Sequence, residues 1–106
     1  MLKPIFNTYY TYILTNSKKT VLYIGVTNNM YKRLVQHKEG TEKNENSFAA
    51  RYRCYFLVYY ETYNQIQVAI AREKELKGWT RKKKESLINH SNPEWKFLNK
   101  LFSEQF

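Results

Sequence analysis

Glu73 is an acidic residue at a position where the helical pattern calls for an apolar one. At about 100° per residue it shares one helix face with four apolar residues, whereas Glu75 points about half a turn away. That face consists of Ile66, Ala69, Ile70, Glu73 and Leu76. Burying a carboxylate is costly unless a cation pairs with it or a metal ion binds it. The sequence therefore predicts that Glu73 faces inward and serves an ion pair or a metal site.

Arg33 and His37 are a second pair of candidates, on an expected helix over about residues 29–38. They are four residues apart, so they lie one above the other at the edge of the apolar arc of that helix. A guanidinium can donate two parallel hydrogen bonds to a phosphate, and an imidazole can donate another or carry a proton. A solvated arginine and a surface histidine fit the same spacing. Tyr12 and Tyr23 lie on two expected strands, where tyrosine is also common as a half-buried β residue.

A run of cations occupies the first turn of another expected helix. Positive charge is unfavourable there because the helix macrodipole is already positive at its N-terminus. A phosphate backbone would compensate for it, and a solvated basic face is the alternative. The run consists of Arg81, Lys82, Lys83 and Lys84.

A β-hairpin and a helix come first among the elements that must position these groups. Residues 9–15 and 21–26 are rich in β-branched and aromatic side chains, with turn residues between them. The candidate caps for the helix over about 29–38 are Thr27, Asn28 and Asn29, and Gly40 is expected to stop it. Residues 40–47 have no periodicity, which predicts an exposed, mobile loop.

A third strand and two helices follow. Residues 55–61 are aromatic and β-branched, which predicts the strand. The helix that carries Glu73 spans about 65–77, and Gly78 stands where a left-handed residue often ends a helix. Thr80 can cap the next helix, over about 81–90.

The sequence predicts an α+β fold, a small three-stranded antiparallel sheet flanked by helices in the order β-β-α-β-α-α-α. Asn92-Pro93 predicts the start of the last helix, which would run to about residue 102. The 106 residues, 42% of them hydrophobic, predict a single domain over 1–106, with a core at about 9–98.

Charge and cysteine content indicate the partner and the compartment. The formal net charge of +9 favours a nucleic acid as partner, unless the charge is incidental. All nine acidic residues are glutamates, which argues against paired-aspartate sites for two metal ions. A single cysteine, Cys54, fits a reducing compartment. No apolar run approaches the roughly 18 residues of a membrane span, and Met1–Pro4 lacks the apolar block of a signal peptide. We expect a cytoplasmic protein without a membrane partner.

Several separate motifs in this chain, in the same order, resemble the GIY-YIG endonuclease domain and most closely its small stand-alone bacterial branch. The resemblance covers about residues 9–98. The first motif matches at Tyr12 only, because the sequence there is Tyr-Thr-Tyr rather than Gly-Ile-Tyr. The residues and motifs that carry the resemblance are Tyr10-Thr11-Tyr12, Tyr23-Ile24-Gly25, Arg33, His37, Glu73, Leu57–Glu61, Arg72–Arg81 and Asn92–Trp95.

The resemblance implies hydrolysis of a nucleic-acid phosphodiester with one divalent cation. The Tyr23 phenol would activate or orient the attacking water, and Tyr12 would line the same pocket. Arg33 would hold the scissile phosphate, and His37 would assist proton transfer or contact the phosphate. Glu73 would bind the cation, magnesium or manganese. Cations near the tyrosines, His37 among them, could lower their pKa values from about 10.

The expected activity is that of a metal-dependent endonuclease, with DNA favoured over RNA. The alternatives are a nucleic-acid-binding module without turnover and a protein-interaction domain whose charge is incidental. Family members also use an asparagine late in the domain, and neither Asn89 nor Asn92 fits that position cleanly. The residues that we expect to contact the substrate are Gly25, Lys32, Arg81, Lys82, Lys83 and Lys84.

Overall fold

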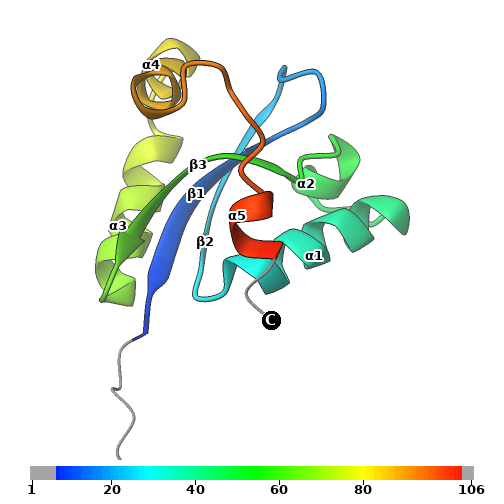
Figure 1. Ribbon diagram of the computed structural model, residues 1–106, viewed down its shortest axis with the longest axis horizontal. Coiled ribbons are helices and arrows are strands. Elements are labelled where there is room, and N and C mark those ends of the chain that lie inside the picture. Colours follow the sequence, from blue (N-terminus) through cyan, green and yellow to red (C-terminus); the bar gives the residue numbers. More distant parts are fainter. Residues whose placement is uncertain (1–6, 104–106) are drawn as a thin grey trace, which may run out of the picture.

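A three-stranded antiparallel sheet with strand order β2-β1-β3 forms the centre of the molecule. The computed structural model describes residues 7–103, so the predicted absence of a signal peptide at Met1–Pro4 lies outside the described residues. Helices cover both faces of the sheet, so the predicted α+β class is confirmed (Figure 1). The strands are β1 (Tyr9–Thr15), β2 (Leu22–Thr27) and β3 (Phe56–Tyr63). The helices are α1 (Met30–Glu42), α2 (Phe48–Arg51), α3 (Ile66–Lys77), α4 (Arg81–Ser91) and α5 (Lys100–Ser103).

The central strand β1 supplies side chains to both hydrophobic cores, because successive residues of a strand point to opposite faces. Tyr12 and Leu14 pack with α1, α2 and α5 on one face. Ile13 packs with α3 and α4 on the other face, through Leu76 and Ile88. In Figure 1, α3 and α4 accordingly lie across the sheet from α1, α2 and α5. Neighbouring residues of β1 are therefore tied to different helices.

Helix α1 begins as predicted and ends later than predicted. The side chain of Asn29 caps it by accepting a hydrogen bond from the Lys32 backbone N–H, 3.0 Å. Gly40 was expected to stop the helix, but α1 continues to Glu42. Gly40 is buried, and a Cβ atom there would lie 2.6 Å from Oε1 of Glu45. This glycine therefore allows a close approach inside the helix and does not end it.

Helices α3 and α4 occupy the predicted segments. Thr80 caps α4 as predicted, by accepting a hydrogen bond from the Lys83 N–H. Gly78 follows α3 as predicted, but its φ of −81° is right-handed, so the expected left-handed cap is wrong. Within residues 7–103, no helix is both long enough and apolar enough to cross a bilayer.

Two segments differ from the sequence prediction. The first is α2, a short helix capped by Ser47, which the sequence pattern did not predict. The second is the segment after α4, where Asn92-Pro93 starts no helix and only Lys100–Ser103 is helical. The Asn92 side chain instead donates to the Val58 carbonyl and bonds both backbone groups of Lys96. Because the Asn92 side chain holds this loop against β3, it is unavailable to cap the N-terminus of a following helix. The observed order is β-β-α-α-β-α-α-α.

Candidate active site

Tyr12 is fully buried and lies directly opposite Gly25 on β2. A Cβ atom on residue 25 would lie 2.6 Å from Cζ of Tyr12, so only glycine leaves room for the ring at this position. The Tyr12 hydroxyl consequently reaches His37 on α1, where Oη and Nε2 are 3.1 Å apart. Gly25, predicted to contact substrate, thus has a packing role that explains its presence.

Three rings from β1, β2 and α1 meet beside Gly25. The Tyr23 ring lies edge-on to the His37 ring with centroids 5.3 Å apart. The Tyr12 and Tyr23 rings are 6.4 Å apart. The fold therefore brings together three of the five predicted catalytic residues, which are far apart in sequence.

Burial determines the protonation of this cluster. Burial and then the Arg33 guanidinium lower the pKa of His37 to about 4, so the imidazole is neutral at pH 7. Burial and then Tyr23 raise the pKa of Tyr12, and Arg33 only partly opposes them. His37 therefore supplies no positive charge at neutral pH, so it does not lower the pKa of Tyr12, contrary to the expectation. Its neutral ring can instead exchange a hydrogen bond with Tyr12.

Arg33 contributes an unused hydrogen-bond donor to the cluster. Its Nε is buried and has no hydrogen-bond partner among residues 7–103. A buried donor without an acceptor is costly, so such an atom is often explained by a ligand or an ordered water. An oxygen of an anionic ligand would satisfy it.

Glu73 lies at the rim of the site rather than inside an aliphatic layer. Its side chain is 21% exposed, and its nearest cation is Lys77, 3.5 Å away. Of the predicted apolar face, Ala69 and Leu76 are buried, whereas Ile66 and Ile70 are 41% and 36% exposed. The prediction of a fully inward face is therefore wrong: α3 packs through Ala69 and Leu76, which are only part of that face. Glu73 still acts on the Tyr12 phenol, because its charge contributes to the raised pKa of that group.

A groove of about 300 Å³ opens beside Tyr23. Besides Tyr23, two cations and a second aromatic ring line it, and of these three residues the sequence analysis proposed only Lys84 as a site residue. The spacing of Lys77, one helical turn after Glu73, could have indicated that it lies near the site. Phe48 lies in a segment without a periodic pattern, so the sequence offered no signal for it. The lining residues are Leu22, Tyr23, Ile24, Phe48, Lys77 and Lys84.

A family model described as the GIY-YIG catalytic domain matches residues 8–86, a range that includes the tyrosines, Arg33, His37 and Glu73. The chain belongs to the GIY-YIG family. It is 38% identical over 80 residues to a UPF0213 protein of Bacillus pumilus (strain SAFR-032), a match that covers 76% of this chain and 78% of that protein. The solution NMR structure of a UPF0213 protein from Bacillus halodurans has a TM-score of 0.52 and 26% identity, covering 89% of this chain and 96% of that one.

The donor set of this GIY-YIG domain fits a cation that keeps most of its water. Among the described residues, no three His, Cys, Asp or Glu side chains are grouped to hold a metal ion. Glu73 is a single, partly exposed carboxylate with a long contact to Lys77. Magnesium and manganese accept one carboxylate together with water and phosphate oxygens. The residues present therefore fit such an ion.

The predicted substrate-binding cations lie in different places and make different contacts. The Arg81 guanidinium donates to the Thr20 carbonyl, 2.8 Å, and pairs with Glu85, 2.9 Å, so it joins α4 to the β1–β2 turn. Lys83 lies over the Trp79 ring, 4.2 Å from its centroid. Lys82 is exposed, and Lys84 lines the groove beside Tyr23. Lys32 lines a separate groove along α1.

The side chains of the two candidate asparagines make their hydrogen bonds away from the ring cluster. Asn89 accepts a hydrogen bond from the indole N–H of Trp95. Asn92 uses its side chain within the loop that covers β3. Both side chains therefore serve the segment after α4.

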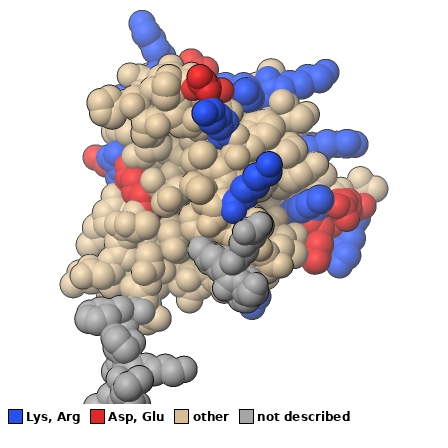
Figure 2. All heavy atoms as spheres, viewed as in Figure 1, with Lys and Arg blue, Asp and Glu red and all other residues tan. Residues whose placement is uncertain are grey.

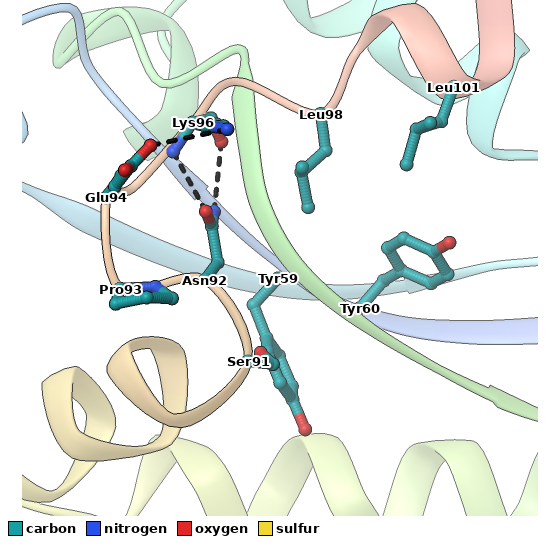
Figure 3. Close-up of a pocket in the computed structure, with 9 residues that line it drawn as sticks. All are labelled: Tyr59, Tyr60, Ser91, Asn92, Pro93, Glu94, Lys96, Leu98 and Leu101. Atoms are coloured by element: carbon teal, nitrogen blue, oxygen red, sulfur yellow. Dashed lines mark hydrogen bonds and ion pairs between the residues drawn. The ribbon is translucent and has the colours of Figure 1, made fainter.

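A larger pocket, about 660 Å³, lies between β3 and the loop after α4 (Figure 3). Its charged residues, Glu94 and Lys96, pair with each other at 3.3 Å. It contains none of the predicted catalytic residues. Size alone therefore does not identify the GIY-YIG site.

Proposed function

We propose that this GIY-YIG domain is an endonuclease that hydrolyses phosphodiester bonds of nucleic acid, with DNA favoured over RNA, and that it uses one divalent cation. The observation that carries the proposal is the buried Nε of Arg33, which has no partner among the described residues, in a cluster with Tyr12 and His37. A phosphate oxygen is the acceptor that would satisfy this donor and gain from its charge.

The remaining residues take roles that follow from their protonation and position. Tyr23 borders the groove and would orient the attacking water beside the phosphate. Tyr12, held protonated by burial, would act as a hydrogen-bond donor, with neutral His37 as its partner. Glu73 would hold magnesium or manganese, which when bound would neutralise charge on the phosphate oxygens.

Surface charge supports nucleic acid as the partner. In the view of Figure 2, Lys and Arg side chains gather along the upper and right edges of the molecule, and the lower left is nearly free of them. Lys77 and Lys84 extend positive charge into the groove beside Tyr23. Cations distributed in this way gain affinity for a phosphate backbone by releasing its counterions. We place the protein in the cytoplasm, where the buried thiol of Cys54 would stay reduced.

The test compares two glutamates of the same helix. Glu73 pairs with Lys77, and Glu75 pairs with Arg72. We expect Glu73→Gln to lower the rate of cleavage of a labelled DNA, in magnesium or in manganese, by about 100-fold or more. The Glu75→Gln variant should stay within a few-fold of the wild type. Equal losses in both variants would remove Glu73 from the proposed site.

The second candidate function is nucleic-acid binding without turnover. Binding of DNA by the wild type in gel-shift titrations, with no cleavage in either metal, would favour it. Affinity that does not change between low and moderate salt would instead exclude phosphates as the main contact.

A further inference from the structure

Helix α2 buries its small side chains and exposes its large aromatic one. It buries two small side chains, Ala49 at 3% and Ala50 at 7% exposure, and leaves the large ring of Phe48 50% exposed. Burial of an aromatic ring is normally the larger gain, so a short helix would be expected to turn Phe48 inward. The exposed ring therefore calls for a partner outside the described residues.

The backbone holds Phe48 in this exposed position. Ser47 caps α2 by accepting a hydrogen bond from the Ala50 N–H, 3.2 Å, and the Cys54 N–H donates to the Ala49 carbonyl, 2.8 Å. Both alanines are buried. A rotation of the helix that turned Phe48 inward would consequently break the Ser47 cap and expose the two alanines.

The Phe48 ring continues the aromatic cluster of the site. It stacks on Tyr23 with centroids 6.3 Å apart and an interplanar angle of 24°. Tyr52 is four residues later and 46% exposed, and the centroids of the Phe48 and Tyr52 rings are 4.7 Å apart. Phe48 also lines the groove that Lys77 and Lys84 border. Aromatic rings and cations therefore meet directly beside the proposed catalytic tyrosine.

We propose that Phe48, supported by Tyr52, is a stacking platform for one nucleobase of the substrate, next to the scissile phosphate. The inference rests on the proposed function and names the class of ligand that the groove takes. Bases stack on aromatic side chains largely irrespective of sequence, while neighbouring lysines hold the backbone. An apolar peptide would gain nothing from Lys77 and Lys84, so the charge of the groove favours a nucleotide.

Stacking on Phe48 requires a base that is not stacked on both of its neighbours in the strand. The nucleotide beside the scissile phosphate would therefore be unpaired or turned out of a duplex. Phe48 would thus act on specificity, and the proposed chemistry would remain with Tyr23, Arg33 and Glu73.

The test measures binding in EDTA, where metal-dependent cleavage does not interfere. A set of single-stranded DNA oligonucleotides, each with the fluorescent base 2-aminopurine at a different position, is titrated with wild type and variants. We expect one or two positions to be quenched by the wild type. Phe48→Ala and Phe48→Leu should lose this quenching and bind about 10-fold more weakly, and Phe48→Trp should restore both. The same oligonucleotides as duplexes show whether a base is also turned out of paired DNA.

Phe97→Ala is the matched control. Phe97 is also exposed, at 38%, and it also stacks on another ring, that of Phe56, with centroids 4.3 Å apart. It does not line the groove beside Tyr23, so binding and quenching should match the wild type. Wild-type quenching and affinity in a folded Phe48→Leu variant would overturn the inference and leave the proposed nuclease function intact. Cleavage that survives Glu73→Gln would be a failure of the proposed site, which the EDTA experiment does not share.

Discussion

Two clusters around the same sheet are built from the same residue types, two tyrosines, an arginine and a glutamate, and they differ in whether their polar groups are satisfied. In the first, Glu61 accepts hydrogen bonds from the hydroxyls of Tyr59 and Tyr63 and from Nε and Nη2 of Arg72, 2.9 and 3.0 Å. In the second, which we propose as the active site, the buried Nε of Arg33 has no partner within the described part of the chain. The donors of the first cluster are satisfied, and the second cluster keeps an unused donor.

The pKa shifts follow from this difference. Burial alone would raise the pKa of Glu61, but the hydrogen bonds from Arg72, Tyr59 and Tyr63 outweigh it and lower the pKa. The bond to Glu61, in turn, raises the pKa of Arg72. In the second cluster burial prevails: Arg33 only partly opposes its effect on the pKa of Tyr12, and His37 stays neutral. A set of residue types alone does not separate a structural network from a reactive one.

The largest expected effects come from replacing the arginine of each cluster by alanine. Arg33→Ala should lower the cleavage rate by about 100-fold or more, because charge on the phosphate loses a fixed donor, and should change the melting temperature little. Arg72→Ala should leave Glu61 buried without its cation and lower the free energy of unfolding by about 3 kcal/mol. Cleavage assays and urea unfolding measure the two effects. A Tm loss for Arg33→Ala as large as that for Arg72→Ala would make Arg33 structural.

Glu61→Gln tests whether the first cluster is purely structural. The amide can accept fewer hydrogen bonds than the carboxylate, so we expect a loss of about 2 kcal/mol in urea unfolding. The cleavage rate of the folded variant should stay within a few-fold of the wild type. A collapse of activity without loss of stability would show that the two clusters are functionally coupled.

Two buried threonines of β1 give a smaller and more local comparison. The Thr11 hydroxyl donates to the Ala69 carbonyl, 2.8 Å, one turn before Glu73, whereas the Thr15 hydroxyl donates to the Val21 carbonyl, 2.7 Å, near the hairpin turn. Thr11→Val and Thr15→Val should each cost about 1 kcal/mol. Only Thr11→Val should also weaken manganese binding, measured by calorimetry, because it loosens the helix that carries Glu73. Equal manganese affinity in both variants would contradict this.

His37 should produce the smallest effect, a loss of stability in acid. Its folded-state pKa of about 4 lies below the ordinary 6.5, so protonation favours the unfolded chain. This penalty is absent above pH 6.5 and grows as the pH falls through 6.5 towards 4. The groups that face the ring are Tyr12, Tyr23 and Arg33. We expect His37→Gln to lose less stability than wild type between pH 7 and pH 5, and His90→Gln, at the end of α4, to behave like wild type.

The sequence predicted the elements that depend on local signals. The two hairpin strands, the Asn29 and Thr80 caps and helix α3 follow from turn chemistry, capping and periodicity. The Asn92-Pro93 start signal failed because tertiary hydrogen bonds to Val58 and Lys96 use the Asn92 side chain. Gly40 failed as a stop because its small size serves packing against Glu45 inside α1. A local signal predicts an element only where no long-range contact competes for the same group.

What the sequence by itself determined is a set of candidate site residues and the strands that carry two of them, because residue type and period are local properties. Only the tertiary structure decided which glutamate and which arginine remain available. Glu61 and Arg72 saturate each other with the help of Tyr59 and Tyr63. Within residues 7–103, the one ion pair of Glu73 is its long contact to Lys77, 3.5 Å. Whether a charged group finds enough hydrogen-bond partners depends on distances between strands and helices, and the spacing of residues along the chain does not give these distances.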